Sequence, residues 1–425
     1  MEGIKVSFDL GESRIRAIVG RQGDSSLRVV ASAEVESSGI EGGAISDNIA
    51  LSSAISKCVR IAESQMGFPI SEATVIVPAI LTQHTNGQGV RRIAGRTRGI
   101  RANDLTKALS NVVYEEPSHA STEHLDLEKT LYALDGKYFI DPPIGIPGRE
   151  LSVFVSLISI NTDVKVELTQ IFDSLGIAKI RLVPNQRAGT LGALTEGERK
   201  LGAILFDIGS RVSTLTLVKG GRMLDTGIVP GGGYHLTNDL SLGLEVSKEL
   251  AEKIKLEFGT TVLEVGSAEI NLERDEEEPL AINRVRMIEL LKERSKEIVS
   301  LAENYMNTSG YGDFPAGGIV LTGGSSELPG LVEIVKQKFN CPVRIANPRG
   351  AERILDNLNN PCWVPVVGGL LWSNNKVGQK APILVTKLIR NMETLKKYFS
   401  ANKSDTPTTL VNPNNKTQGE VALTK

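Results

Sequence analysis

Apolar and polar positions alternate along the first stretch of the chain. Residues 4–36 contain three alternating runs with turn signals at Gly20–Gly23, which predicts a three-stranded meander. Residues 49–66 then carry apolar side chains at helical spacing, and residues 73–77 form a short apolar run typical of a buried strand. Strands, a helix and a further strand in this order predict an α/β unit with a mixed sheet.

The pattern changes from about residue 84. Residues 85–101 hold four glycines and five arginines with little periodicity. The next elements expected are a helix over 105–113 capped by Asn103-Asp104, a strand over 132–140, a Pro/Gly loop over 141–148 and a strand over 150–159. They predict a small α+β insertion. Beyond it we expect a helix over 163–175, a strand over 180–182, a helix over 186–194 and a turn at Glu196–Glu198.

The most informative pattern is residues 203–239, AILFDIGSRVSTLTLVKGGRMLDTGIVPGGGYHLTND. An apolar strand leads to an Asp-x-Gly turn, two further strands follow around a Gly-Gly turn, and a triple glycine precedes a helix. The same figure occurs at the N-terminus, where Val6–Gly11 parallels Ile204–Gly209. Two copies of one hairpin predict two similar halves that face each other across a cleft, with a phosphate group between the two turns.

The remaining pattern predicts the second half of the body. We expect a helix over 240–259, followed within 260–284 by a strand-like piece and then the acidic run Glu273–Glu278 as a solvated loop. A helix over 285–307 comes next, and residues 317–330 hold a strand, a Gly-Gly turn and the start of a helix. A strand over 343–345 and a helix over 364–372 complete the series. The body therefore ends near residue 372.

After about residue 376 the composition shifts to Asn, Lys, Thr, Ser and Gln, which is typical of disorder. Residues 383–399 are the exception, because apolar and basic side chains there share helical spacing. The segment fits an interfacial membrane helix attracted to anionic headgroups. The alternative is a terminal helix that docks on its own domain. The residues assigned to membrane contact are Leu384, Lys387, Leu388, Arg390, Met392, Leu395, Lys396 and Phe399.

Composition narrows the classes of function. A length of 425 residues is too great for one core, and a net charge of −2 with 4% aromatic residues gives no reason to expect a nucleic-acid partner. The three cysteines lack CxxC spacing and the four histidines form no zinc motif, which favours a reducing compartment without structural zinc. No signal peptide or membrane-spanning run is apparent, so any membrane contact is expected to be peripheral.

The glycine turns suggest nucleotide chemistry. Backbone N–H groups after Gly11 and Gly209 would form a nest for phosphate oxygens. Asp9 and Asp207, at the ends of buried strands, would place carboxylates near a Mg²⁺ ion. Gly231–Gly233 would let the backbone approach a ribose or phosphate, and Gly323-Gly324 would do the same for a base.

With these motifs in this order, the chain resembles the superfamily of actin, heat-shock chaperones and sugar kinases, and within it the FtsA family of bacterial cell-division proteins. Asp9–Gly11 and Asp207–Gly209 are similar to the phosphate motifs, and GGIVLTGGSSELPG at 317–330 to the adenosine motif. Gly231–Asp239 with Ala251–Gly259 resembles the base-contacting segment, and Asp141–Leu151 the loop that closes the FtsA insertion. The resemblance covers roughly residues 4–372.

The resemblance implies an α/β, actin-like (ribonuclease H-like) two-lobed fold with an FtsA-type 1C insertion and a C-terminal amphipathic tail. It also implies ATP and Mg²⁺ as cofactors, with Asp9 and Asp207 at the metal. The nucleotide-binding residues it implies are Gly11, Glu12, Ser13, Gly209, Ser210, Arg211, Gly231, Gly232, Gly233, Glu252, Lys255, Gly323, Gly324 and Ser325. No residue stands out as catalytic.

The domain division that follows has four subdomains and a tail. Subdomain 1A takes residues 1–83, 158–195 and the return segment 363–375, the 1C insertion takes 84–157, 2A takes 196–242 and 308–362, 2B takes 243–307, and the tail is 376–425 with its helix at 383–399.

The implied function is that of an adaptor which tethers FtsZ polymers to the membrane. It would bind the FtsZ C-terminal peptide through 2B, self-associate into protofilaments through 1C, and meet an anionic membrane surface and other divisome proteins, but no nucleic acid. It would act at the cytoplasmic face of the cell membrane, as a peripheral protein of the division septum. Arg294 and Glu297 resemble the FtsZ-binding helix, although solvated charges on an amphipathic helix would give the same pattern.

Two departures from the family pattern weaken the expected phosphate site. Ser210–Thr214 replaces the usual Gly-Gly-Thr-Thr-Asp, and Glu12 replaces a small hydroxyl residue and would repel a γ-phosphate unless Mg²⁺ or Arg14 intervenes. We therefore expect a nucleotide-binding adaptor with weak or altered binding and at most weak ATPase activity. The alternatives are a genuinely hydrolysing ATPase and a membrane-machine scaffold of the PilM type.

Overall fold

The computed structural model describes residues 3–23, 27–41, 44–95, 98–114, 121–139, 141–263, 269–274, 277–309, 316–351 and 358–374. The predicted tail helix at 383–399, with all eight residues assigned to membrane contact, lies outside these ranges. Within them, no helix is both long enough and apolar enough to cross a membrane.

Two five-stranded sheets share one strand order. In each, an antiparallel meander of three strands is extended by two strands that run parallel to its first strand. The first sheet has the order β12 (Lys179–Pro184), β6 (Glu72–Val77), β1 (Ile4–Leu10), β2 (Arg14–Gln22), β3 (Leu27–Glu36). The second has the order β19 (Val343–Ile345), β18 (Ile319–Thr322), β13 (Ala203–Ile208), β14 (Val212–Lys219), β15 (Arg222–Pro230). The prediction of two similar halves is confirmed.

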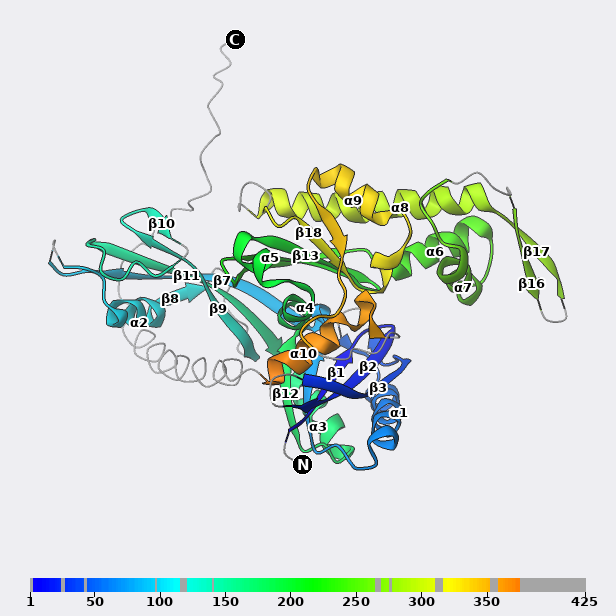
Figure 1. The fold of residues 1–425 in the computed structure, drawn as a ribbon, viewed down its shortest axis with the longest axis horizontal. Helices are drawn as coiled ribbons and strands as arrows, with labels where there is room; N and C mark the ends of the chain where they lie inside the picture. The colour runs from blue at the N-terminus through cyan, green and yellow to red at the C-terminus, as the bar shows by residue number, and fades with distance from the viewer. Residues whose placement is uncertain are drawn as a thin grey trace, which may run out of the picture.

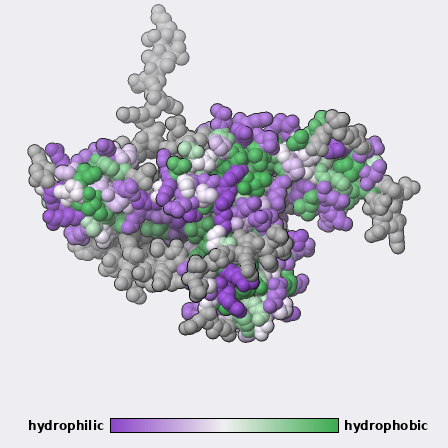
Figure 2. Space-filling view, in the orientation of Figure 1, coloured by the Kyte–Doolittle hydropathy of each residue, from purple (hydrophilic) through white to green (hydrophobic). Residues whose placement is uncertain are grey.

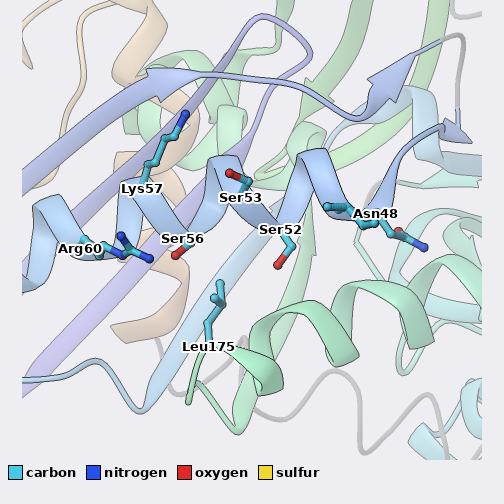
Figure 3. Close-up of a pocket in the computed structure, with 8 residues that line it drawn as sticks. Asn48, Ser52, Ser53, Ser56, Lys57, Arg60 and Leu175 are labelled. Atoms are coloured by element: carbon cyan, nitrogen blue, oxygen red, sulfur yellow. The ribbon is translucent and has the colours of Figure 1, made fainter.

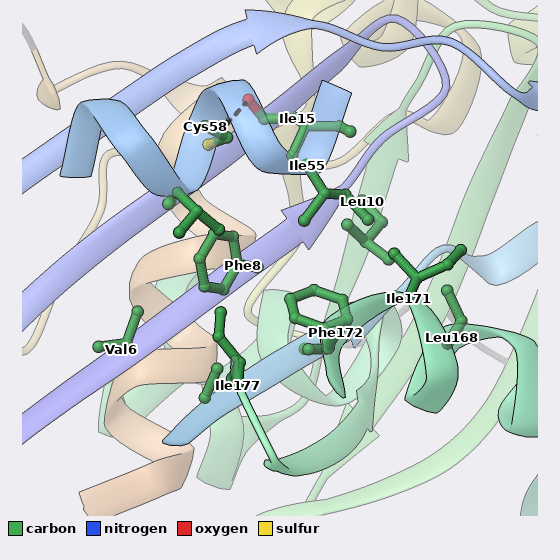
Figure 4. Packing of buried hydrophobic residues seen from close by; sticks show 14 of the residues in the cluster. Val6, Phe8, Leu10, Ile15, Ile55, Cys58, Leu168, Ile171, Phe172 and Ile177 are labelled. Carbon is green, nitrogen blue, oxygen red and sulfur yellow. Dashed lines mark hydrogen bonds between the residues drawn. The ribbon is translucent and has the colours of Figure 1, made fainter. Parts of the chain in front are cut away.

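The first sheet is covered on both faces. On one face α1 (Asn48–Met66) and α3 (Thr162–Ser174) bury the strand residues that point toward them, and Figure 4 shows Phe8 of β1 meeting Phe172 of α3, with ring centroids 5.4 Å apart. On the other face lie α4 (Asn185–Ala193) and α10 (Val364–Asn374). Because alternate strand residues are buried on opposite faces, these strands are apolar nearly throughout.

The second sheet packs mainly against α8 (Arg284–Thr308) and α9 (Leu331–Phe339), with α6 (Gly233–Leu244) and α7 (Lys248–Phe258) beside α8. The start of α10 and the end of α4 reach its opposite face. These two helices therefore lie between the two sheets, as Figure 1 shows.

A third sheet is inserted in the first lobe between β6 and α3. All its pairings are antiparallel, and α2 (Ala102–Ser110) packs on it. Its order is β10 (Lys137–Phe139), β9 (Thr122–Leu134), β11 (Glu150–Asn161), β7 (Thr82–Arg92), β8 (Val112–Tyr114). In Figure 1 this insertion extends to one side of the body, and the hairpin of β16 (Glu269–Arg274) and β17 (Glu277–Asn283) extends to the other.

Short elements complete the described chain: β4 (Ile40–Glu41), β5 (Ala44–Ile45), α5 (Glu196–Leu201) and the 3-10 turns η1 (Ala79–Leu81), η2 (Gly324–Glu327) and η4 (Pro361–Trp363).

Several predicted elements are wrong in detail. The helix expected over 240–259 is two helices, because Glu245 takes a left-handed conformation (φ 56°) and Ser247 caps α7 anew. The strand expected over 132–140 breaks at the turn Asp135-Gly136, where both φ angles are positive.

Three further segments are more regular than predicted. The turn expected at Glu196–Glu198 begins α5, where Thr195 and Glu198 form a capping box. The described residues of the acidic run lie in β16 and β17 rather than in a loop, and Arg274 pairs with Glu277 across the two strands. The Gly/Arg-rich segment after residue 84 continues β7 as far as Arg92, paired with β11 along its length.

Candidate functional site

The two Asp-Gly turns of the two lobes touch. Gly11 follows β1 and Gly209 follows β13, at matching positions of the two sheets. The backbone N–H of Arg211 donates to Glu12 Oε2 across 3.2 Å, although the two residues are 199 positions apart. The structure thus places the predicted phosphate turns at one junction between the lobes.

Two carboxylates lie behind these turns. Asp9 is buried, and burial raises its pKa to about 7, with Arg16 opposing the rise and the nearby Asp207 adding to it. Burial also raises the pKa of Asp207, whose Oδ2 accepts from Asn185 Nδ2 at 2.6 Å; that bond and Arg16 oppose the rise. A Mg²⁺ ion is commonly held by one or two carboxylates together with phosphate and water, so Asp9 and Asp207 are the residues that would hold it. Among the described residues, no group of three or more His, Cys, Asp or Glu side chains is arranged to hold a metal ion.

The start of α6 closes over the second turn. The N–H groups of Gly233 and Tyr234 donate to the carbonyls of Gly209 and Ser210, both at 2.9 Å. A Cβ on Gly232 would lie 2.4 Å from the carbonyl oxygen of Gly209, so only glycine allows this approach. The first two N–H groups of this helix are therefore bonded to the protein's own turn.

The base-contacting side chains predicted from the sequence lie next to this turn. Lys255 Nζ donates to Glu252 Oε2 (2.7 Å), to Thr237 Oγ1 (2.8 Å) and to the carbonyl of Gly233 (3.1 Å). Ser325 Oγ donates to the carbonyl of Gly209 at 3.4 Å.

The two glycines before Ser325 differ in their surroundings. Gly323 abuts Asp207, since a Cβ there would lie 2.4 Å from its Oδ1, whereas a Cβ on Gly324 would meet no atom within 4 Å. The adenosine side of the predicted site thus has converging polar groups and open space.

Other predicted nucleotide residues point elsewhere. Ser13 is exposed, and its carbonyl accepts from Ser37 N at 3.1 Å within the first lobe. Gly231 faces α8, where a Cβ would lie 2.7 Å from Ile298. The guanidinium of Arg211 lies over the ring of Tyr234, 4.1 Å from its centroid.

The predicted partner-binding pair lies on α8. Arg294 forms a two-point ion pair with Asp239 of α6, through Nε to Oδ2 (2.6 Å) and Nη2 to Oδ1 (3.0 Å). Its Nη1 donates to Glu297 Oε2 at 2.5 Å. Arg294 is thus not simply a solvated charge, because it joins α8 to α6.

Sequence reasoning missed the start of α4, where three consecutive residues reach three parts of the chain. Asn185 bonds to Asp207 in the second lobe, and Gln186 Nε2 donates to Thr82 Oγ1 (3.4 Å) at the base of the insertion. Arg187 donates to Asp126 Oδ2 (2.7 Å) and Glu128 Oε2 (2.6 Å) on β9. The available signal was a polar run directly after an apolar strand, the position where a sheet presents its site residues.

A separate pocket of about 480 Å³ lies along the outer side of α1. Figure 3 shows its lining side chains on that helix, together with Leu175 after α3. The labelled lining residues are Asn48, Ser52, Ser53, Ser56, Lys57, Arg60 and Leu175. It shares no residue with the predicted nucleotide site.

The predicted cofactors fit this structure only in part. On the adenosine side, a Cβ on Gly324 would meet no atom within 4 Å, and Lys255 and Ser325 supply polar atoms that a nucleoside would contact. On the phosphate side, Glu12 already occupies an N–H donor of the second turn. The residues therefore suit a nucleotide, but not a terminal phosphate at that donor.

Comparison with known proteins finds sequence similarity to cell-division proteins. The family model described as "Cell division protein FtsA" matches residues 204–368. FtsA of Pseudomonas aeruginosa is 25% identical over 376 residues, covering 87% of this chain and 89% of that protein. FtsA of Bacillus subtilis is 27% identical over 346 residues, covering 81% of this chain and 78% of that protein.

Solved structures share the fold at low sequence identity. The "PilM-PilN type IV pilus biogenesis complex" is similar with a TM-score of 0.62 and 14% identity, covering 86% of this chain and 97% of that one. MreB5 of Spiroplasma citri bound to ADP is similar with a TM-score of 0.54 and 13% identity, covering 89% and 98%. These matches confirm the resemblance: the chain is similar to the cell-division protein FtsA along most of its length, and it shares the actin-like fold.

Proposed function

We propose that this protein is an actin-like adaptor of cell division, which tethers FtsZ polymers to the cytoplasmic membrane and assembles into protofilaments. It acts as a peripheral protein on the cytoplasmic face, at the division septum, beside other divisome proteins. The observation that carries the proposal is the match to FtsA proteins over 81–90% of the chain. The subdomain division given above, with 1C at 84–157 and 2B at 243–307, belongs to the proposal.

Self-association is assigned to the insertion. It carries exposed apolar side chains on both edge strands of its sheet, and Figure 2 shows green surface over this end of the molecule. Val113 is 71% exposed, Tyr138 58% and Ile144 55%. Exposed apolar side chains on the edge strands of a sheet favour contact with another chain. Sedimentation of the chain with and without Val113→Ser and Ile144→Ser tests this, and unchanged assembly would remove the insertion from the contact.

Membrane attachment is assigned to the tail. The experiment is pelleting with vesicles that contain anionic lipid, comparing the full chain with residues 1–375. We expect the full chain to pellet and the shortened chain to stay in solution, with zwitterionic vesicles as the control for charge. Equal pelleting of both forms would show that the tail is not the anchor.

Binding of the FtsZ C-terminal peptide is assigned to the second lobe, near Arg294 and Glu297. The matched variants are Arg294→Ala and Lys296→Ala, since Lys296 lies on the same helix and, among the described residues, pairs only with the exposed Glu293. Fluorescence anisotropy of a labelled peptide should show at least about tenfold weaker binding for Arg294→Ala and little change for Lys296→Ala. If the unaltered protein does not bind the peptide, the alternative function, a membrane-machine scaffold of the PilM type, is favoured.

Nucleotide binding is assigned to the junction between the lobes, with an adenine nucleotide beside Lys255 and Ser325 and Mg²⁺ at Asp9 and Asp207. When bound, Mg²⁺ would offset the charge of phosphate oxygens. The protein's own groups would orient the nucleoside. ATP turnover clearly above that of an Asp207→Ala variant would instead favour the hydrolysing ATPase.

A further inference from the structure

Glu12 distinguishes the junction of the two Asp-x-Gly turns from an ordinary triphosphate site. Its Oε2 accepts from the backbone N–H of Arg211 at 3.2 Å. Its Oε1 is buried and has no hydrogen-bond partner among the described residues. A carboxylate from one lobe is thus directed at a backbone donor of the other, where the second Asp-Gly turn would receive an anion.

The surroundings leave few donors for a competing anion. The N–H groups of Gly233 and Tyr234 are bonded to Gly209 and Ser210. The side chain of Arg211 lies against Tyr234, whose hydroxyl also accepts from Lys248 Nζ at 2.9 Å. Among the described groups, Arg211 therefore meets Glu12 through its backbone N–H rather than through a guanidinium hydrogen bond.

The charges around Glu12 also disfavour a second anion at the backbone N–H of Arg211. Burial raises the pKa of Glu12, the N–H bond and positive charge of Arg211 lower it, and Glu41 raises it. A terminal phosphate placed at the same N–H would add a second anion within a few ångströms, in a partly buried setting where repulsion is only weakly screened.

We propose that Glu12 acts as a built-in substitute for the terminal phosphate, so that the nucleotide site selects nucleoside diphosphates over triphosphates. The inference rests on the proposed nucleotide site and adds the residue that sets its specificity. A diphosphate leaves the Glu12–Arg211 contact in place, whereas a triphosphate must displace it.

The experiment is isothermal titration calorimetry of the full chain with ADP and with the non-hydrolysable triphosphate analogue AMPPNP, each with Mg²⁺. We expect the unaltered protein to bind ADP at least about tenfold more tightly, which corresponds to about 1.4 kcal/mol. Glu12→Ser should bring the two affinities within about threefold by strengthening AMPPNP. Glu12→Gln, which keeps the size and removes the charge, should give an intermediate ratio.

Controls separate this inference from the nucleotide site itself. Glu41→Ser removes a nearby exposed carboxylate that does not bond to Arg211 and should leave the ratio unchanged. Thermal melting of each variant verifies folding. If both nucleotides bind but Glu12→Ser leaves their ratio unchanged, or if the unaltered protein prefers AMPPNP, the role of Glu12 is refuted while the nucleotide site stands. If neither nucleotide binds any variant, both are refuted.

Discussion

Replacing Arg187 tests how the insertion is held against the body. Its guanidinium, on α4, donates to Asp126 and Glu128 on β9 at 2.7 and 2.6 Å. Only 17% of the Arg187 side chain is exposed, against 10% for Asp126 and 24% for Glu128. Charges this far from water depend on each other, since removing one partner leaves the others buried without compensation.

The variant Arg187→Met keeps a long side chain and removes the charge. Breaking a buried pair from one side typically costs about 3–5 kcal/mol, because the remaining carboxylates lose their donor yet stay desolvated. A protein of several units need not unfold in one step, so the cost is measured as a change in local opening rather than in global unfolding. The assay is therefore hydrogen exchange of peptides from β9 and α4. We expect exchange in β9 to speed up by about a hundredfold or more.

Two comparisons make this result decisive. Lys179→Met removes a cation from an exposed pair with Glu72, whose side chains are 72% and 61% exposed, and should cost less than about 1 kcal/mol. The triple variant Arg187→Met, Asp126→Leu, Glu128→Leu removes all three charges and should recover most of the lost protection. If Arg187→Met changes exchange no more than Lys179→Met does, the buried triad does not hold the insertion in place.

Three further outcomes follow from packing and charge. A Cβ on Gly368 would lie 1.8 Å from the carbonyl oxygen of Ala188. Gly368→Val should therefore lower the free energy of unfolding by at least about 2 kcal/mol, seen as a lower melting temperature. Gly324→Ala should be nearly neutral, because a Cβ there meets no atom within 4 Å. Burial raises the pKa of Glu198, but hydrogen bonds from Arg344 and Thr195 outweigh burial and lower the pKa to about 2. The ionised Glu198 therefore stabilises the fold fully above about pH 4.5, and this contribution is lost as the pH falls toward 2. In Glu198→Gln, the urea midpoint should fall less steeply over that pH range. Burial raises the pKa of the Cys58 thiol to about 12, so pulse alkylation near neutral pH, read by mass spectrometry, should label it only after unfolding.

Local pattern predicted the two matching sheets because each begins with the same apolar run and Asp-x-Gly turn. It missed the first part of β9, where charged residues interrupt the alternation. Asp126 and Glu128 belong to that strand because Arg187, distant in sequence, compensates them. A strand stabilised by a remote ion pair has a weak hydrophobic signature.

In the candidate site, too, local features could be predicted from the sequence and a contact between distant residues could not. The Asp and Gly positions could be read from spacing alone, since strand ends and turns are local features. The contact between Glu12 and Arg211 could not, because it depends on how two separately folded lobes meet. The sequence indicated that Glu12 was unusual, and the structure identifies its partner.

The position of α10 has a consequence for synthesis on the ribosome. Strands β1, β2 and β6 are complete by residue 77, yet one face of their sheet, including Ile18 and Ile76, is buried by Val367 and Leu370 of α10. The lobe that is translated first is therefore finished last. Until α10 leaves the exit tunnel, the nascent chain displays an apolar surface that invites aggregation or a chaperone. Ribosome-bound chains halted before residue 364 should accordingly bind more chaperone than chains that extend beyond the tail.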